Sequence, residues 1–230
     1  MKITYLGHSC FFVETAAARL IIDPFLTDNP TAAAQAADIR CDYILISHGH
    51  CDHTGDALDI ARRNNATIIS NHEICNYFAA QGAPVHNMNP GGAFTFPFGR
   101  VKLTIAHHSS SEDSDAANPL QPVYLGSPCG LLVEAGGKRV YHAGDTALFL
   151  DMQLIARGGL DLAMLPIGDN FTMGPGDALD ALDMLKPAAA IPMHYNTWPP
   201  IAQDAQAFAA AAKQRNHLVH PLAPGESVTI

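Results

Sequence analysis

The stretch ISHGHCDHTG, residues 46–55, most constrains the fold, because it places three histidines and an aspartate within six positions. It overlaps the apolar run YILI at residues 43–46, which has the length and composition of a buried strand. Imidazoles that crowd together repel one another when protonated and need partners when buried. The sequence therefore predicts that the fold brings further polar groups to the end of this strand.

The overall composition limits the class of protein. The formal net charge of −9 argues against a general nucleic-acid binder, which normally carries a basic face. No run of eighteen apolar residues is present, so we expect no membrane span. The first ten residues, MKITYLGHSC, lack the apolar core of a signal peptide, and the five cysteines are widely spaced without a C-x-x-C pair. We therefore expect a cytoplasmic protein with reduced thiols.

Strand and helix patterns are mixed along the whole chain, and no linker or change of composition divides it. We expect strands at residues 2–6, 10–14, 19–22, 42–47, 67–70, 101–106, 131–134, 139–142, 161–166, 188–193 and 218–222. We expect helices at residues 56–64, 73–81, 177–185 and 202–215. These patterns predict one α/β domain that spans residues 1–230.

Residues 109–128, SSSEDSDAANPLQPVYLGSP, show no periodicity and are rich in Ser, Asp and Pro. An irregular segment of this length inside a compact domain is often a functional lid or a binding loop. Two interpretations stay open, a lid that closes on substrate and a plain surface insertion. The apolar residues near its far end, between positions 120 and 125, would pack over a cleft or against a second subunit of a homo-oligomer.

Ligating side chains follow several of the predicted strands at the point where each strand ends. They are His48, His50, Asp52 and His53, then His107 and His108, then Asp145, and finally His194. Strand ends on one edge of a sheet converge, so these side chains are expected to share a cleft. Imidazoles and carboxylates without thiolates suit Zn²⁺, Mn²⁺ or Fe²⁺, and their number is sufficient for two ions.

The ordered set resembles the metallo-β-lactamase superfamily, in which H-x-H-x-D-H is followed by a lone histidine, a Gly-Asp pair and a final histidine. The segments GHSCFFVET, IIDPFL, HHSSS, YHAGDT, PIGDNFTMGP and IPMHYNTW are similar to its small metal-dependent hydrolase branch, which is related to the ascorbate-6-phosphate lactonases. The resemblance covers the whole chain. It implies a four-layer αβ/βα sandwich of two similar halves, with two divalent metal ions, zinc before manganese or iron, at the edge between the sheets.

The resemblance also implies the role of each ligand. Its ligand set in this chain is His48, His50 and His108 for the first metal, Asp52, His53 and His194 for the second, and Asp145 between them. It selects His108 over His107 because the ligand stands immediately before Ser109, and it leaves His107 as a residue that contacts a ligand. True β-lactamases commonly carry a cysteine in the second site, whereas this chain has Asp145, which argues against β-lactam hydrolysis.

Three further residues near the motif have open or minor roles. His8 lies between two strands, where its imidazole is satisfied either by its own turn or by a place in the substrate pocket, which the resemblance favours. Asp23 either accepts a hydrogen bond from a ligating imidazole or caps the turn at Pro24. Cys51 is expected to be buried, because neighbours along a strand-like turn face opposite ways.

The expected chemistry is hydrolysis. Two divalent ions deprotonate a water near neutral pH and polarise a carbonyl or phosphoryl oxygen. The ligand set contains only two carboxylates, so the site stays positive and favours a small anionic substrate. Asp52 and Asp145 are the catalytic candidates, with Asp52 placed to carry the proton of the nucleophile to the leaving group. The leading function is hydrolysis of a small ester, lactone or phosphodiester.

Three alternatives to this function are considered. A mononuclear iron oxidoreductase on the same fold is disfavoured because the second set, Asp52, His53 and His194, is retained. A nuclease is disfavoured by the acidic balance and by the absence of an extra binding domain. A catalytically silent scaffold is disfavoured because no ligand position is missing.

Overall fold

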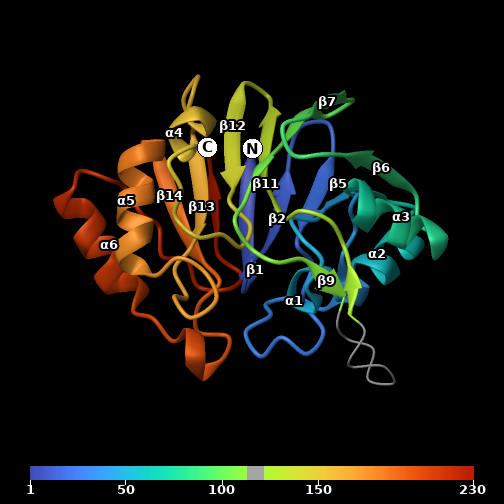
Figure 1. Cartoon of the computed structure of the whole chain (residues 1–230), viewed down its shortest axis with the longest axis horizontal. Helices are drawn as coiled ribbons and strands as arrows, with labels where there is room; N and C mark the ends of the chain where they lie inside the picture. Colours follow the sequence, from blue (N-terminus) through green and yellow to red (C-terminus); the bar gives the residue numbers. More distant parts are fainter. Residues whose placement is uncertain (113–121) are drawn as a thin grey trace.

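A computed structural model describes residues 1–112 and 122–230, and in these residues two β-sheets face one another with helices on the outside (Figure 1). The first sheet has the order β15-β1-β2-β3-β4-β5-β6. Its strands are β1 Lys2–Gly7, β2 Cys10–Glu14, β3 Arg19–Ile22, β4 Tyr43–Leu45, β5 Thr67–Asn71, β6 Val85–Met88 and β15 Ser227–Thr229.

The second sheet has the order β14-β13-β12-β11-β8-β7. Its strands are β7 Ala93–Phe96, β8 Gly99–Ile105, β11 Cys129–Ala135, β12 Lys138–His142, β13 Leu162–Pro166 and β14 Ala189–Met193. In both sheets an antiparallel part continues into a parallel part, which begins at the pair β3–β4 in the first sheet and β12–β13 in the second. The strands β13 and β14 are buried along their whole length, as is usual for parallel strands covered on both faces.

The helices lie on the two outer faces (Figure 1). They are α1 Cys51–Thr54, α2 Ala57–Asn64, α3 His72–Ala80, α4 Met152–Ile155, α5 Pro175–Leu185 and α6 Ala205–Gln214, with short 3₁₀ turns η1 Ala36–Asp38 and η2 Pro199–Ile201. The side chain of Asn71 begins α3 by accepting a hydrogen bond from Ile74 N, and Asp204 begins α6 in the same way. No helix in the described residues is long and apolar enough to cross a membrane.

Alternation along the strands divides the apolar side chains between two cores. On β3, Leu20 and Ile22 belong to the core between the sheets, while Ile21 belongs to the core on the other face of the first sheet. That second core contains Ile60 of α2 and Phe78 of α3. The helices α5 and α6 cover the second sheet in the same manner. The expected four-layer αβ/βα arrangement is therefore confirmed.

The predicted and observed elements differ at the edges of the sheets. The strand expected at 218–222 is wrong, because only Val219 forms an isolated bridge, with Ala190, and Pro221 has no N–H to continue a ladder. The strands β6, β7 and β15 and the helix α4 were not expected. In the segment expected as a lid or an insertion, residues 113–121 lie outside the described residues, and its ends form the short pair β9 Ser111–Glu112 and β10 Val123–Tyr124.

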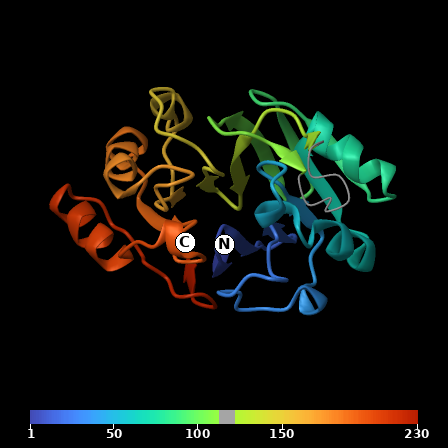
Figure 2. The same cartoon turned by 60° about the horizontal axis from the view of Figure 1, so that its bottom comes forward.

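Backbone hydrogen bonds at the ends of strands join the two sheets at one edge. Cys129 N donates to the carbonyl oxygen of Ser47 at 2.9 Å, and His194 N donates to that of His8 at 2.8 Å. The chain ends also meet, since β15 pairs with β1 (Figure 2). At Gly144 the sheets approach so closely that a Cβ would lie 2.8 Å from the Ser47 Cβ.

This close approach predicts an unequal response to two alanine substitutions. Gly144 and Gly136 both have positive φ, +62° and +58°, but only Gly136 has open space where a Cβ would be. We expect Gly136→Ala to lower the free energy of unfolding by about 1 kcal/mol, and Gly144→Ala by about 2 to 4 kcal/mol because overpacking adds to the backbone cost. Urea unfolding measures both. Equal losses would show that the sheets do not constrain this turn.

Candidate metal centre

Four loops that leave the strands at one edge of the sandwich carry the candidate ligands, near α1 (Figure 1). The loop after β4 carries His48, His50, Asp52 and His53, the loop after β8 carries His108, the loop after β12 carries Asp145, and the loop after β14 carries His194. The ligating atoms of these residues fall into three overlapping groups, and within each group all atoms lie within 4.8 Å of one another. The structure thus brings together all seven ligands that the family resemblance implies.

The third group shares one histidine with each of the other two. The groups are His48, His50 and His108, then His8, Asp52, His53 and His194, and finally His48, His53 and Asp145. The first two match the two ligand sets that the family resemblance implies, with His8 added to the second. Each group offers enough imidazole and carboxylate atoms to hold a metal ion.

Asp145 lies between the first two groups. Its Oδ2 is 2.9 Å from Nε2 of His194 and 3.6 Å from Nε2 of His108, while its Oδ1 is 3.3 Å from Nε2 of His53. The carboxylate is 2% exposed, so these imidazoles replace most of its contact with water. A single buried side chain therefore contacts residues of both groups.

The one-turn helix α1 spaces the residues of the motif. His50 precedes it with extended backbone (φ −64°, ψ 149°), and the backbone N–H of His53 donates to the His50 carbonyl at 3.0 Å. Cys51 is exposed, so the expectation that it is buried is wrong. The physical reason is that helical backbone begins at Cys51, where the alternation of an extended chain no longer applies.

Asp23 orders the motif from the neighbouring strand end. It is fully buried with a left-handed φ of 45°, and its carboxylate accepts hydrogen bonds from Ser47 N at 2.7 Å and Ser47 Oγ at 2.6 Å. Its Oδ2 also lies 2.8 Å from Nδ1 of His53. Of the two roles left open for Asp23, the contact with a candidate ligand is the one that the geometry supports. When the His53 ring is neutral, the N–H at Nδ1 leaves Nε2 with its lone pair directed to the cluster.

His8 reaches the cluster through a strained turn. Its φ is 55°, its Nε2 lies 3.1 Å from Asp52 Oδ2, and its Nδ1 lies 2.7 Å from Thr197 Oγ1. The ring also packs against Phe25 and Trp198. Sequence reasoning placed His8 in a pocket but missed Thr197 as its partner, because that contact joins residues 189 positions apart.

His107 and His142 lie outside these groups. The exposed ring of His107 packs edge-on against Phe149 at 5.0 Å between ring centroids, and His107 belongs to none of the candidate groups found among the described residues. Nδ1 of His142 accepts from Gly144 N at 3.1 Å, so its Nε2 carries the proton and donates to the Ser9 carbonyl at 3.0 Å. His142 thereby holds the turn that precedes Asp145.

The donor atoms fit divalent cations. Nε2 of His53 and Oδ1 of Asp145 are buried and make no hydrogen bond with any described residue. Nε2 of His48 and Nδ1 of His50 face one another at 3.0 Å. Buried lone pairs directed at a common space need a proton or a metal ion between them. The set contains nitrogen and oxygen donors without thiolate, which suits zinc, manganese or iron.

The buried imidazoles of the cluster fall into two classes, those whose pKa is lowered and those whose pKa is raised. Burial holds the pKa of His48 well below its ordinary value and lowers that of His8 to about 4, and neighbouring imidazoles add to both shifts. Burial opposes the charge of His53 and His194 too, but carboxylates outweigh it, chiefly Asp145. They raise the pKa of His194 to about 9 and hold that of His53 well above the ordinary range.

Comparison with known proteins places this chain in a family. The family model described as "Beta-lactamase superfamily domain" matches residues 18–195. A "UPF0173 metal-dependent hydrolase" of Desulforamulus reducens is 53% identical over 232 residues, and one of Opitutus terrae is 46% identical over 230, with each alignment covering 100% of both chains. The solved structure of Igni18, a metallo hydrolase from Ignicoccus hospitalis, is 38% identical with a TM-score of 0.88, covering 99% of this chain and 97% of that one.

The chain therefore belongs to the metallo-β-lactamase superfamily, and within it to the UPF0173 metal-dependent hydrolases. It is a metal-dependent hydrolase with the metallo-β-lactamase fold.

The split in imidazole pKa values predicts that the metal-free protein is most stable near neutral pH. Below about pH 6.5 His8 and His48 bind protons in the unfolded chain but stay neutral in the folded protein, because their folded-state pKa values are lowered. The free energy of unfolding therefore falls as the pH is lowered. The raised pKa of His194 contributes stability that is fully present below about pH 6.5 and is lost as the pH rises toward its folded-state value of about 9.

Urea unfolding in the presence of a chelator, at several pH values between 5 and 9, measures this dependence. Added zinc should remove the alkaline loss, because bound imidazoles are already deprotonated. Stability of the metal-free protein that rises steadily from pH 6.5 to 9 would contradict the prediction.

Proposed function

We propose that the protein holds two divalent cations, zinc before manganese or iron, and hydrolyses a small anionic ester, lactone or phosphodiester. The observation that carries the proposal is the position of Asp145, whose carboxylate contacts imidazoles of both candidate groups. A carboxylate with two oxygens is suited to bind two cations at once, whereas one cation would leave the second group of buried donors without a partner.

Each cation would have its own set of ligands. The first would be held by His48, His50 and His108, the second by Asp52, His53 and His194, and both by Asp145. When bound, such a pair supplies a water of lowered pKa and a positive charge that polarises a carbonyl or phosphoryl oxygen. The hydrogen bond from His53 to Asp23 would keep the imidazole in the tautomer that binds metal through Nε2.

Asp52 would move the proton in the reaction. Its side chain is 19% exposed, unlike that of Asp145, so it lies where the candidate centre meets solvent. Its Oδ2 lies within 4.0 Å of ring nitrogens of His8 and His194, which hold the carboxylate in place. Asp52 would take the proton released by the attacking water and deliver it to the leaving group.

Charge favours an anionic substrate. Two divalent cations against the two carboxylates Asp52 and Asp145 would leave a net positive site. The other five ligands are imidazoles, which are neutral when they bind metal. A negative group on the substrate, or the negative charge that develops at an attacked carbonyl or phosphoryl oxygen, is stabilised by this excess.

The first test removes single ligands. We expect His48→Ala and Asp145→Ala to lower metal content by at least one ion per chain and to reduce hydrolysis by about 10²-fold or more, because the cations supply several kcal/mol to the transition state. Elemental analysis measures the ions, and assays with lactone, phosphodiester and ester panels measure turnover. Full metal content in both variants would overturn the assignment.

A neighbouring pair of histidines gives a matched control. His108 belongs to the first candidate group, whereas the ring of His107 packs on Phe149. We expect His108→Ala to weaken binding of one ion, so that about half of the metal is lost on dialysis, and His107→Ala to retain both ions. Loss of metal from the His107 variant alone would assign the ligand to the other histidine.

A further inference from the structure

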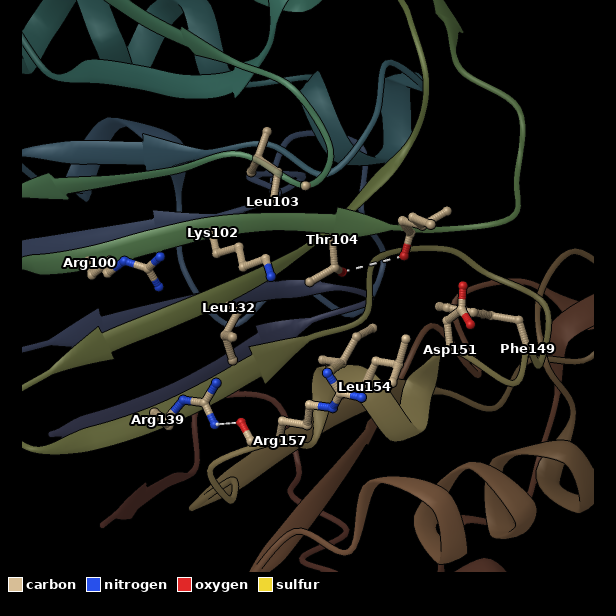
Figure 3. Close-up of a pocket in the computed structure, with 13 residues that line it drawn as sticks. Arg100, Lys102, Leu103, Thr104, Leu132, Arg139, Phe149, Asp151, Leu154 and Arg157 are labelled. Atoms are coloured by element: carbon tan, nitrogen blue, oxygen red, sulfur yellow. Dashed lines mark hydrogen bonds between the residues drawn. The ribbon is translucent and has the colours of Figure 1, made fainter.

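A hollow lies on the outer face of the second sheet, away from the candidate metal ligands. It has a volume of about 410 Å³ and is bounded by β8, β11 and β12 on one side and by the α4 region on the other (Figure 3). None of the seven candidate metal ligands lines it. Its volume lies in the range of small-molecule sites, roughly 300 to 1,000 Å³.

The hollow concentrates positive charge in an acidic protein. Four of the 13 lysines and arginines line it, namely Arg100 and Lys102 of β8, Arg139 of β12 and Arg157 beyond α4. Figure 3 shows Arg100, Lys102 and Arg139 directed into the same space. The opposing carboxylates are Asp151 in the lining and Glu134, which forms ion pairs with Arg139 at 2.9 Å and Arg100 at 3.8 Å. Four cations against two carboxylates leave the local charge positive while the whole chain carries −9.

The cations differ in how they are held. Arg139 is fixed, because its Nε donates to Glu134 Oε1 at 2.9 Å and its Nη1 donates to the carbonyl oxygens of Arg157 and Gly159, each at 2.6 Å. Lys102 is half-buried, and its ammonium group makes no hydrogen bond or ion pair with any described residue. An ammonium group that has lost part of its water without gaining a partner is ready to bind an anion.

Apolar side chains form the rest of the surface. Leu132 lies between Lys102 and Arg139 (Figure 3) but is only 2% exposed, so the accessible apolar surface belongs to Leu154 of α4 and to Ile105. Leu154 is 50% exposed and Ile105, at the end of β8, is 47% exposed. Exposed apolar side chains next to cations suit a ligand that carries both a negative charge and an apolar part.

We propose that this hollow binds a small amphiphilic anion, with a phosphate, sulfonate or carboxylate group on Lys102 and Arg157 and an apolar part on Ile105 and Leu154. The site is independent of the proposed metal centre. A macromolecular polyanion is disfavoured, because the hollow has the volume of a small molecule and the remaining surface is acidic.

The test uses 8-anilinonaphthalene-1-sulfonate, a fluorescent probe that carries one sulfonate and an apolar ring system. We expect the metal-loaded protein to bind it saturably at one site, with a Kd that rises with sodium chloride. Lys102→Gln should weaken binding by about tenfold, since one charge-assisted contact is lost. Lys213→Gln, which removes an exposed charge on α6, is the matched control and should bind as the parent does.

Two further variants keep the test decisive. Arg157→Gln, at an exposed position, should also weaken binding, and His48→Ala should bind the probe as the parent does because the metal centre is elsewhere. Circular dichroism of each variant checks that it folds. The proposal is overturned if the parent does not bind the probe, if Lys102→Gln and Arg157→Gln bind it unchanged, or if binding is lost in His48→Ala.

Discussion

The buried carboxylate of Asp145 is the constraint on which the edge of the sandwich depends. A carboxylate that is 2% exposed must find positive or hydrogen-bonding partners within the protein. Among the described residues, the imidazoles of His48, His53, His108 and His194 have ring nitrogens within 4.0 Å of it. These histidines come from loops of both sheets. The side chains that form the candidate centre are therefore also the ones that hold the two sheets together at this edge.

A layer of hydrogen bonds behind the cluster keeps its members in place. Asp23 binds both Ser47 and His53, and Ser47 in turn accepts a backbone hydrogen bond from Cys129 of the opposite sheet. On the other side, His142 holds the turn before Asp145. Side chains that chelate metal need such support, because a ligand free to rotate loses affinity for the ion.

The strand β8 contributes residues to two separate regions of the second sheet. The strand β8 presents Lys102 to the outer hollow and leads, three residues beyond its end, to His108 in the candidate centre. Alternation along one strand permits this division, because side chains directed outward do not affect those directed to the core. The hollow and the centre can therefore carry different ligands on one scaffold.

The sequence by itself determined a mixed α/β domain and most of the strands, because buried strands and helix patterns are local signals. The crowded motif at residues 48–53 predicted a metal site, and the family resemblance supplied the four-layer fold and the choice of the seven candidate ligands. Contacts between distant residues were decided only by the tertiary structure. Sheet packing places Thr197 on His8, selects the contact of Asp23 with His53, and separates the ring of His107 from the cluster. It also gathers into one hollow four cations whose positions span 58 residues, from Arg100 to Arg157. The physical reason is that strand register and the close approach of two sheets set these distances, and neither is encoded in any short segment.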